Sequence, residues 1–582
     1  MATVTMTEEH THRESFSEKT MTNGSANENT NDSASDSKDA IDEKQTDAAP
    51  RSPKNDSPPA HEYPGALSLT AILVAVYLAI FLVALDRTII ATAIPRITDD
   101  FHALGDIAWY GSAYLLTSCS FQLTFGRLFT FYSPKWIFLA AIVIFEVGSA
   151  ICGAAPNSTA FIVGRAIAGM GSCGIFSGTI VIITDAVPLQ KRPMMTGLMG
   201  SLFGISSVVA PLMGGAFTDR VTWRWCFYIN LPIGAVTLLI ISLILKASPP
   251  PHPSPAKTMK ERLDQLDPFG TLAFLPGIVC LILALQWGGT TYAWSNGRII
   301  ALFVLFGVLM IAFVFVQRWK QETASVPPRL AKMRSIGAGF WFSLCVGGSM
   351  MLFVYYLPIW FQAIKGASAV KSGIMNIPLV LALVLGSIIA GAMVSKIGYF
   401  TPFMILGSTV MSIGAGLLTT FTTTTNHPMW IGYQVVLGLG IGLGMQQSSV
   451  AAQTILERKD VPTGAALMML AQSLGGAIFL AVAQTVFDNN LVSHVQKSIH
   501  GQHGQNIAQL VLQAGATGIR GLVSPADLQP VLVAYNSAIT KTFYVGLGLA
   551  CASIIGALLM EWKSVKRGDK ENKPAPPKDE EA

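Results

Sequence analysis

The sequence predicts an all-α polytopic membrane protein with about fourteen transmembrane helices. From about residue 67 to residue 560, apolar segments of about twenty residues alternate with short loops that hold most of the charges. A hydrocarbon core about 30 Å thick requires about twenty helical residues, and only helices or closed barrels satisfy the backbone there. The composition agrees, because 51% of the residues are hydrophobic and only 13% are charged, compared with about 25% charged residues in soluble domains.

Fourteen segments have the length and hydrophobicity of spanning helices. A proline-rich stretch at 249–255 precedes the seventh segment, and a long extracellular loop is expected at 487–540, before the last one. Cytoplasmic tails are expected at residues 1–66 and 561–582. The predicted spans are 67–94, 107–130, 136–154, 159–184, 196–217, 226–246, 268–288, 298–317, 336–361, 372–394, 402–421, 429–450, 464–486 and 541–560.

The N-terminal tail is rich in Ser, Thr, Asn, Asp and Glu and has few large apolar side chains, so it is expected to be disordered. It lacks the pattern of a signal peptide, so the first span is expected to direct insertion. Most Lys and Arg residues lie in loops on the side of the N-terminus. The positive-inside rule therefore places both termini in the cytoplasm. The plasma membrane is the expected location, and a vacuolar or vesicular membrane is the alternative.

Three features of the first part of the chain recur in the second part at nearly one offset of about 267 residues, as in internally repeated transporters. The pairs are Gly126 with Gly391, Gly169 with Gly438, and Thr196 with Thr463. The repeat predicts two homologous six-helix halves, at 67–246 and 336–560. A linker and two inserted helices are expected between them, at 247–335. Such repeats form the frame of many secondary transporters, whose substrate site lies between the halves.

The turn between the second and third spans carries a family motif. Residues 126–135 read Gly-Arg-Leu-Phe-Thr-Phe-Tyr-Ser-Pro-Lys, which resembles the loop signature Gly-x-Leu-x-Asp-Arg-x-Gly-Arg-Lys of the major facilitator superfamily. Gly126, Leu128 and Lys135 fit the signature, whereas Thr130 replaces its acidic residue. The resemblance implies the major facilitator fold, with an incomplete charge relay in this loop.

A second motif lies in the fourth span. Arg165, Gly169 and Gly171 resemble the Arg-x-x-x-Gly-x-Gly helix of the same superfamily. The glycines are expected to let neighbouring helices approach closely. A dinucleotide-binding loop is excluded, because no strand precedes these glycines and the segment lies in the membrane.

The fifth span contains an antiporter-like element. Residues 210–215 read Ala-Pro-Leu-Met-Gly-Gly and resemble the Gly-Pro-x-x-Gly-Gly element of antiporters in this superfamily. Pro211 is expected to kink the helix. Gly214 and Gly215 are expected to let spans meet closely and seal one side of the pore. The alternative is a kink that serves packing only.

Two further stretches narrow the resemblance. Residues 85–95 read Leu-Asp-Arg-Thr-Ile-Ile-Ala-Thr-Ala-Ile-Pro, and residues 223–234 read Trp-Arg-Trp-Cys-Phe-Tyr-Ile-Asn-Leu-Pro-Ile-Gly. With the fourteen spans, they resemble the fourteen-spanner drug:proton antiporter family, especially fungal pumps for toxins and secondary metabolites. The resemblance implies export of amphipathic small organic molecules by proton antiport, driven by the proton gradient without a cofactor. The alternative is proton-coupled uptake of a siderophore or similar solute.

Charged residues inside the spans are candidates for proton coupling, because a charge in a spanning helix is costly unless it meets water or a partner. Asp86 and Arg165 are expected at similar depth in the outer half of the membrane. Asp86 is expected to take up a proton, and Arg165 to tune its proton affinity and couple protonation to helix movement. A structural ion pair is the alternative. Glu146 in the third span is a second candidate for protonation, or an acid satisfied by a neighbouring helix.

Several polar side chains are weaker candidates. The candidates to line a cavity for an amphipathic substrate are Tyr114, Gln122, Tyr355 and Gln446. Aromatic residues at helix ends also anchor at the lipid interface. Asn157 lies in an Asn-x-Thr sequence in an outward loop and is a candidate for glycosylation.

Other functional classes find no support in the motifs. No Gly-x-x-x-x-Gly-Lys-Ser/Thr loop and no His-Glu-x-x-His sequence occurs, so neither direct use of ATP nor intramembrane metalloenzyme chemistry is indicated. The seven cysteines lie in apolar segments without metal-ligand spacing. The expected partners are a small-molecule substrate and the lipid bilayer, without nucleic acid, and the protein is expected to be a monomer.

Overall fold

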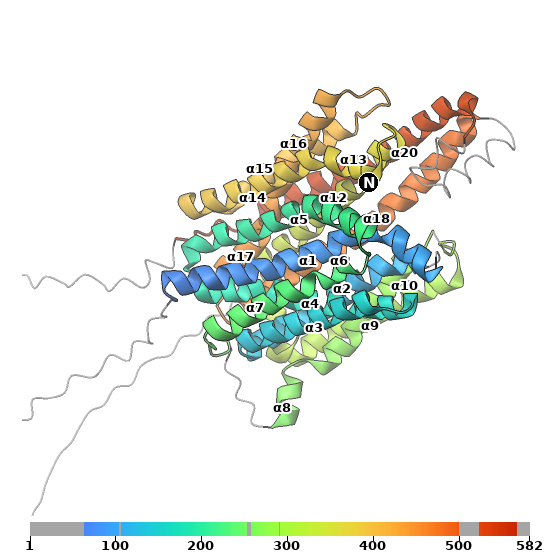
Figure 1. Cartoon of the computed structure of the whole chain (residues 1–582). Coiled ribbons are helices and arrows are strands. Elements are labelled where there is room, and N and C mark those ends of the chain that lie inside the picture. Colours follow the sequence, from blue (N-terminus) through green and yellow to red (C-terminus); the bar gives the residue numbers. More distant parts are fainter. Residues whose placement is uncertain (1–62, 104–105, 253–257, 290, 500–522, 567–582) are drawn as a thin grey trace, which may run out of the picture. The chain divides into compact units, whose positions relative to one another are not determined.

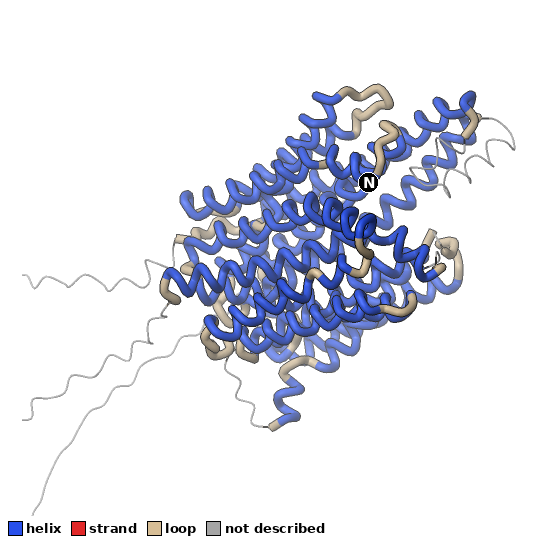
Figure 2. The backbone as a smooth tube through the Cα atoms, in the orientation of Figure 1, coloured by secondary structure: helices blue, strands red, loops and turns tan. Residues whose placement is uncertain are grey.

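The computed structural model describes residues 63–103, 106–252, 258–289, 291–499 and 523–566. The chain divides into two units, residues 1–61 and 62–582, and the first lies outside the described residues. The predicted disorder of the N-terminal tail therefore falls on residues that are not described. Within the described part of the second unit, helices joined by short loops make up almost all of the chain, and no strand occurs (Figure 1 and Figure 2).

The first group of helices corresponds to the predicted N-terminal half. Helices α1, α3 and α5 begin at one end of the bundle, here called the proximal end, and run toward the distal end (Figure 1). The group consists of α1 (Ala66–Phe101), α2 (Ile107–Phe131), α3 (Pro134–Ala154), α4 (Ser158–Ala186), the 3-10 helix η2 (Leu189–Lys191), α5 (Arg192–Arg220), α6 (Trp225–Tyr228) and α7 (Asn230–Ile244).

The remaining helices form the inserted pair and the second half. The inserted segment contains α8 (Met259–Asp264), α9 (Pro268–Trp287), α10 (Gly297–Lys320), η3 (Gln321–Thr323) and α11 (Pro328–Ala331). The second half contains α12 (Arg334–Ala363), α13 (Ala369–Met375), α14 (Ile377–Ile397), α15 (Thr401–Leu418), α16 (His427–Met445), α17 (Gln447–Ile455), α18 (Val461–Ser498) and α20 (Pro525–Leu559).

Thirteen helical segments of the described chain are long and apolar enough to cross a membrane. The remaining predicted span is α2, which has 25 residues but is too polar to be counted with them. Its buried Ser112, Ser120 and Gln122 account for part of this polarity. Because α2 packs against α4, α9 and α18, these groups face other helices instead of lipid. The predicted all-α polytopic membrane fold is confirmed.

Helices extend into both ends of the range 487–540, in which a long loop is expected. Helix α18 continues to Ser498, and α20 already begins at Pro525. The two extensions pack against each other through side chains such as Leu491, Val495 and Val531, which are buried in one cluster. They remain helical because apolar contacts between them continue beyond the most hydrophobic stretch of each helix.

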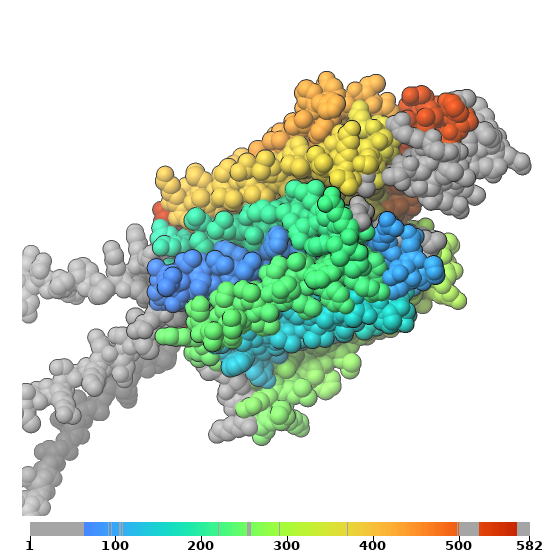
Figure 3. Space-filling view, in the orientation of Figure 1, coloured from blue at the N-terminus to red at the C-terminus, as the bar shows by residue number. Residues whose placement is uncertain are grey.

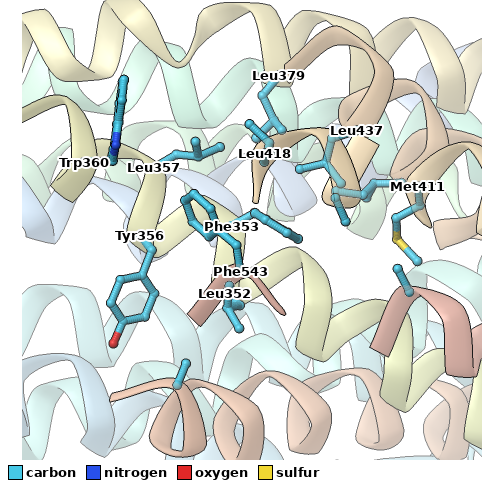
Figure 4. Packing of buried hydrophobic residues seen from close by; sticks show 14 of the residues in the cluster. Leu352, Phe353, Tyr356, Leu357, Trp360, Leu379, Met411, Leu418, Leu437 and Phe543 are labelled. Atoms are coloured by element: carbon cyan, nitrogen blue, oxygen red, sulfur yellow. The ribbon is translucent and has the colours of Figure 1, made fainter. Parts of the chain in front are cut away.

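Each half has a large apolar core. In the second half, α12, α14, α15, α16, α18 and α20 share a continuous cluster of buried side chains. Figure 4 shows Phe353 of α12 beside Phe543 of α20, and their ring centres lie 5.2 Å apart. The ring of Trp360 lies 4.5 Å from that of Phe421. In the first half, α1 packs between α5 and α7, and the three helices lie side by side in the space-filling view (Figure 3).

Glycines set the closest helix contacts, as the sequence predicts. A Cβ atom added to Gly171 of α4 would lie 2.4 Å from the backbone nitrogen of Phe145 in α3. A Cβ atom at Gly169 would lie 2.3 Å from the carbonyl oxygen of Tyr114 in α2. Contacts this short leave no room for a side chain, so α4 packs directly on the backbones of α2 and α3.

The two halves meet near their proximal ends. A Cβ atom at Gly197 of α5 would lie 2.5 Å from the carbonyl oxygen of Ser387 in α14. Arg458, which precedes α18, forms an ion pair of 2.7 Å with Asp185 at the end of α4. Tight backbone packing and an ion pair therefore join the first half to the second half at this end.

The inserted segment contacts both halves at the proximal end. Arg127 of α2 donates hydrogen bonds of 2.9 and 3.0 Å to the carbonyl oxygens of Gln265 and Thr323, which flank the inserted pair. Arg329 of α11 forms two hydrogen bonds, of 2.7 and 2.9 Å, with Asp460 at the start of α18. The inserted segment thus bridges α2 and α18.

We expect Gly171→Ala to destabilise the protein by about 1–3 kcal/mol, because the added methyl group forces α3 and α4 apart. Thermal unfolding of the purified protein in detergent, followed by intrinsic fluorescence, measures the effect. Gly215→Ala in α5 is the matched control, because a Cβ atom there meets no other atom within 4 Å. Equal melting temperatures for the two variants would contradict the packing assigned to Gly171.

We expect Arg329→Gln to destabilise the protein by about 1 kcal/mol, a value discounted for the partial exposure of this side chain. The hydrogen bonds that Arg329 donates to Asp460 and Glu322 raise its pKa, so its guanidinium stays charged throughout the physiological pH range. The control is Glu322→Gln, which removes the more exposed partner and leaves the Asp460 pair intact. If Glu322→Gln lowers the melting temperature more than Arg329→Gln does, the dominant role of the Asp460 pair is refuted.

Candidate functional site

A buried ion pair connects α1 and α4 in the distal part of the first half. Arg165 Nη1 lies 2.6 Å from Asp86 Oδ2, and the two side chains are 1% and 0% exposed. The guanidinium also donates a hydrogen bond of 3.0 Å from Nε to the carbonyl oxygen of Tyr110. The ring centre of Tyr114 lies 4.5 Å from its central carbon. Because the two side chains are in contact, Asp86 and Arg165 lie at similar depth in the bundle, as the sequence predicts.

Aromatic side chains cover the distal side of this ion pair. The ring of Phe161, one turn before Arg165 in α4, lies 5.1 Å from Tyr110 and 5.2 Å from Phe227. Trp223 adds a further edge contact of 5.8 Å with Phe161. This aromatic cluster separates the ion pair from the distal surface. Attraction between the charges is therefore stronger than at an exposed site.

Asn230, the first residue of α7, faces the second oxygen of Asp86. Its Nδ2 atom lies 3.5 Å from Asp86 Oδ1 and 3.1 Å from the hydroxyl of Ser149 in α3. The side chain is fully buried. The sequence analysis assigns no role to Asn230. An amide at the start of an apolar span is nevertheless a signal, because polar residues in spanning helices are rare and usually functional.

Glu146 lies near this group on the facing sides of α3 and α7. It is buried, and neither carboxyl oxygen has a hydrogen-bond partner among the described residues. A Cβ atom at Gly234 of α7 would lie 1.9 Å from Glu146 Oε1, so this glycine provides the space for the carboxyl group. Ser149 and Asn230 lie one turn away on the same two helices, since residues three or four apart share a helix face.

The antiporter-like element of α5 is only partly as expected. The helix continues through Pro211. A Cβ atom at Gly214 would lie 2.0 Å from Thr92 Oγ1 of α1, so this glycine does allow close helix contact. The prediction is wrong for Gly215, where a Cβ atom would meet nothing within 4 Å. The adjacent glycine points to a different side of the helix, and only one of the two faces α1.

The other motif residues have packing roles. A Cβ atom at Gly126 would lie 2.8 Å from that of Ala466, so α2 and α18 approach closely there. Lys135 donates a hydrogen bond of 2.7 Å to the carbonyl oxygen of Ser242 at the end of α7. Gly169 packs on the backbone of α2, as described above. None of these three residues contacts the Asp86 ion pair.

The predicted cavity residues differ in exposure. Tyr114, Gln122 and Gln446 are buried, and Gln122 donates a hydrogen bond of 2.7 Å to Ser177. These three side chains pack against other helices in the described conformation, and their role in lining a substrate cavity stays a prediction. Tyr355 differs, because 48% of its surface is exposed. Its role in substrate binding stays a prediction.

Asn157 is exposed at the distal end, where α4 begins. Its side-chain oxygen accepts a hydrogen bond of 2.9 Å from the backbone nitrogen of Ala160 and so caps the helix. The position is accessible on the surface of the described chain. Glycosylation of this residue stays a prediction.

Solved structures with this fold are membrane transporters. The human organic anion transporter MFSD10 aligns with a TM-score of 0.54 at 13% identity, over 83% of this chain and 99% of that one. The proton:xylose symporter XylE aligns with a TM-score of 0.52 at 14% identity, over 79% and 100%. At these identities the likeness concerns the fold alone.

Curated relatives are much more similar in sequence. The MFS-type efflux pump MFS1 of Arthroderma benhamiae is 56% identical over 86% of this chain and 92% of the relative. The rubrofusarin-specific efflux pump aurT of Gibberella zeae is 52% identical, over 87% and 91%. The efflux pump aflT of Aspergillus parasiticus is 50% identical, over 87% and 98%. The family model of the major facilitator superfamily matches residues 76–480, and the chain belongs to this superfamily.

Proposed function

We propose that this protein is a secondary active transporter that exports amphipathic small organic molecules, such as a toxin, a secondary metabolite or a drug, by proton antiport. The relatives named as efflux pumps support the direction of transport and the substrate class. The buried Asp86–Arg165 pair carries the mechanism. A titratable acid that is paired inside a membrane protein is a site where proton binding changes the packing of helices.

Protonation of Asp86 removes the negative charge that compensates Arg165. The guanidinium then keeps only neutral partners, which are the protonated carboxyl group, the carbonyl oxygen of Tyr110 and the ring of Tyr114. Loss of one partner of a buried ion pair typically costs about 3–5 kcal/mol. A two-state equilibrium shifted by this amount changes by a factor of more than about one hundred. Proton binding at Asp86 therefore favours a conformation in which α1 and α4 separate.

Glu146 serves as a second proton site in this proposal. A carboxylate without a hydrogen-bond partner is strongly disfavoured in a buried position, so Glu146 is neutral in the conformation described here. It becomes charged when helix movement exposes the space between α3 and α7 to water. The two acids would then release protons in different conformations of one transport cycle.

The proton gradient supplies the energy in this proposal, and no cofactor takes part. The proximal end is the cytoplasmic side, because the positively charged loops lie there, and the plasma membrane is the proposed location. In a sealed liposome, an antiporter moves protons and substrate in opposite directions, whereas a symporter moves them together. Purified protein with a pH-sensitive dye inside the liposomes, and rubrofusarin as the first probe, tests this directly. If protons and substrate move in the same direction, the protein is a symporter and the alternative of proton-coupled uptake holds.

We expect Asp86→Asn to reduce proton-driven transport by at least about tenfold, which corresponds to about 1.4 kcal/mol. The neutral amide cannot exchange a proton, although it retains the size of the carboxyl group. Initial rates in proteoliposomes, at equal amounts of folded protein, provide the measurement. Asp99→Asn is the control, because Asp99 lies on the same helix but is exposed. Unchanged transport in the Asp86 variant would leave the ion pair with a structural role only.

We expect Glu146→Gln to preserve transport while fewer protons move per substrate molecule. Glutamine has the shape of the neutral acid and fits the space beside Gly234, but it does not titrate. The measurement is the ratio of proton flux to substrate flux in the same liposomes. If the ratio equals that of the unmodified protein, Glu146 has a packing role and does not carry a transported proton.

A further inference from the structure

We propose that Asn230 is a positioning residue for Asp86, and that its amide group accommodates both protonation states of the carboxyl group. The inference rests on the proposed proton coupling and extends it to α7. Arg165 occupies Oδ2 of Asp86, whereas Asn230 faces Oδ1 at 3.5 Å. The two oxygens therefore have different roles, and Oδ1 is the atom that receives the proton while Oδ2 still faces the guanidinium.

With Asp86 ionised, the Nδ2 group of Asn230 donates toward two acceptors. These are Asp86 Oδ1 at 3.5 Å and the hydroxyl oxygen of Ser149 at 3.1 Å. The amide oxygen of Asn230 has no hydrogen-bond partner among the described residues, and the side chain is fully buried. This state thus leaves one buried acceptor unsatisfied, which is unusual in a folded protein.

With Asp86 protonated on Oδ1, the carboxyl group becomes a donor. Rotation of the Asn230 amide by about 180° exchanges its nitrogen and oxygen, because the two atoms occupy similar positions in a planar group. The oxygen then accepts from the Asp86 hydroxyl. It also accepts from Ser149, because a serine hydroxyl can donate or accept. Both contacts of Asn230 therefore persist with reversed direction, and the amide nitrogen takes the position in which the oxygen had no partner.

Among the described residues, no titratable group takes the position of Asn230 beside Asp86 Oδ1. The titratable or charged groups that surround Asp86 on its own helix and the packed helices are Arg87 of α1, Tyr114 of α2, Glu146 and Cys152 of α3, Arg165 of α4 and Cys226 of α6. Arg165 faces the other carboxyl oxygen, and Glu146 faces Gly234. Asn230 is thus the group through which α7 and Ser149 of α3 respond to the proton.

Infrared difference spectroscopy of the purified protein, recorded between high and low pH, tests this inference without a substrate. The C=O stretching band that disappears in Asp86→Asn belongs to protonated Asp86. We expect Asn230→Leu to shift this band to higher frequency, because a carboxyl group without a hydrogen-bond partner absorbs at higher frequency. Ser149→Ala is a milder second variant, in which we expect a smaller shift in the same direction.

The control is Asn376→Leu in the second half, which removes another buried amide whose oxygen has no partner among the described residues. A merely structural role of Asn230 predicts the same band frequency in all folded variants. An unshifted Asp86 band in both Asn230→Leu and Ser149→Ala overturns the inference but leaves the proposed proton site intact. Absence of any band that depends on Asp86 overturns both.

Discussion

The distal part of the first half is organised around one buried charge pair. Asp86 and Arg165 lie within 2.6 Å of each other where helices α1, α2, α4 and α7 converge. An unpaired charge at this depth would be strongly unfavourable, so the helices must keep the two charged side chains in contact. The glycines of α4, the aromatic cover around Phe161 and the amide of Asn230 each serve this requirement.

The ionic contacts between the halves lie far from this pair, at the proximal end. They include the ion pair of Asp185 with Arg458 and the bridge that Arg329 forms with Asp460. A physical connection exists through α1 and α5, because Thr92 contacts Gly214 and the proximal part of α5 packs on α14 through Gly197. A change in the packing of α1 thus reaches the interface between the halves through a helix that contacts both.

The sequence predicts the helices well because the membrane imposes a length and a hydrophobicity on each one. It fails where contacts between helices decide the outcome. The extensions of α18 and α20 stay helical through mutual packing, which no local pattern reveals. The different surroundings of Gly214 and Gly215 depend on how α5 is rotated toward α1. Asn230 becomes a candidate only when α7 brings it to Asp86.

Comparison of the two repeated halves shows which features serve helix packing and which depend on charged side chains. Gly440 packs on Met411 in the second half as Gly171 packs on Phe145 in the first. At the repeat position of Arg165 stands Gln434, which donates to the carbonyl oxygen of Met375 as Arg165 donates to that of Tyr110. A neutral amide therefore supports the same helix junction in the second half. Since the second half forms this junction without ions, packing alone does not require the buried pair of the first half, which agrees with the proposal that this pair binds and releases a proton.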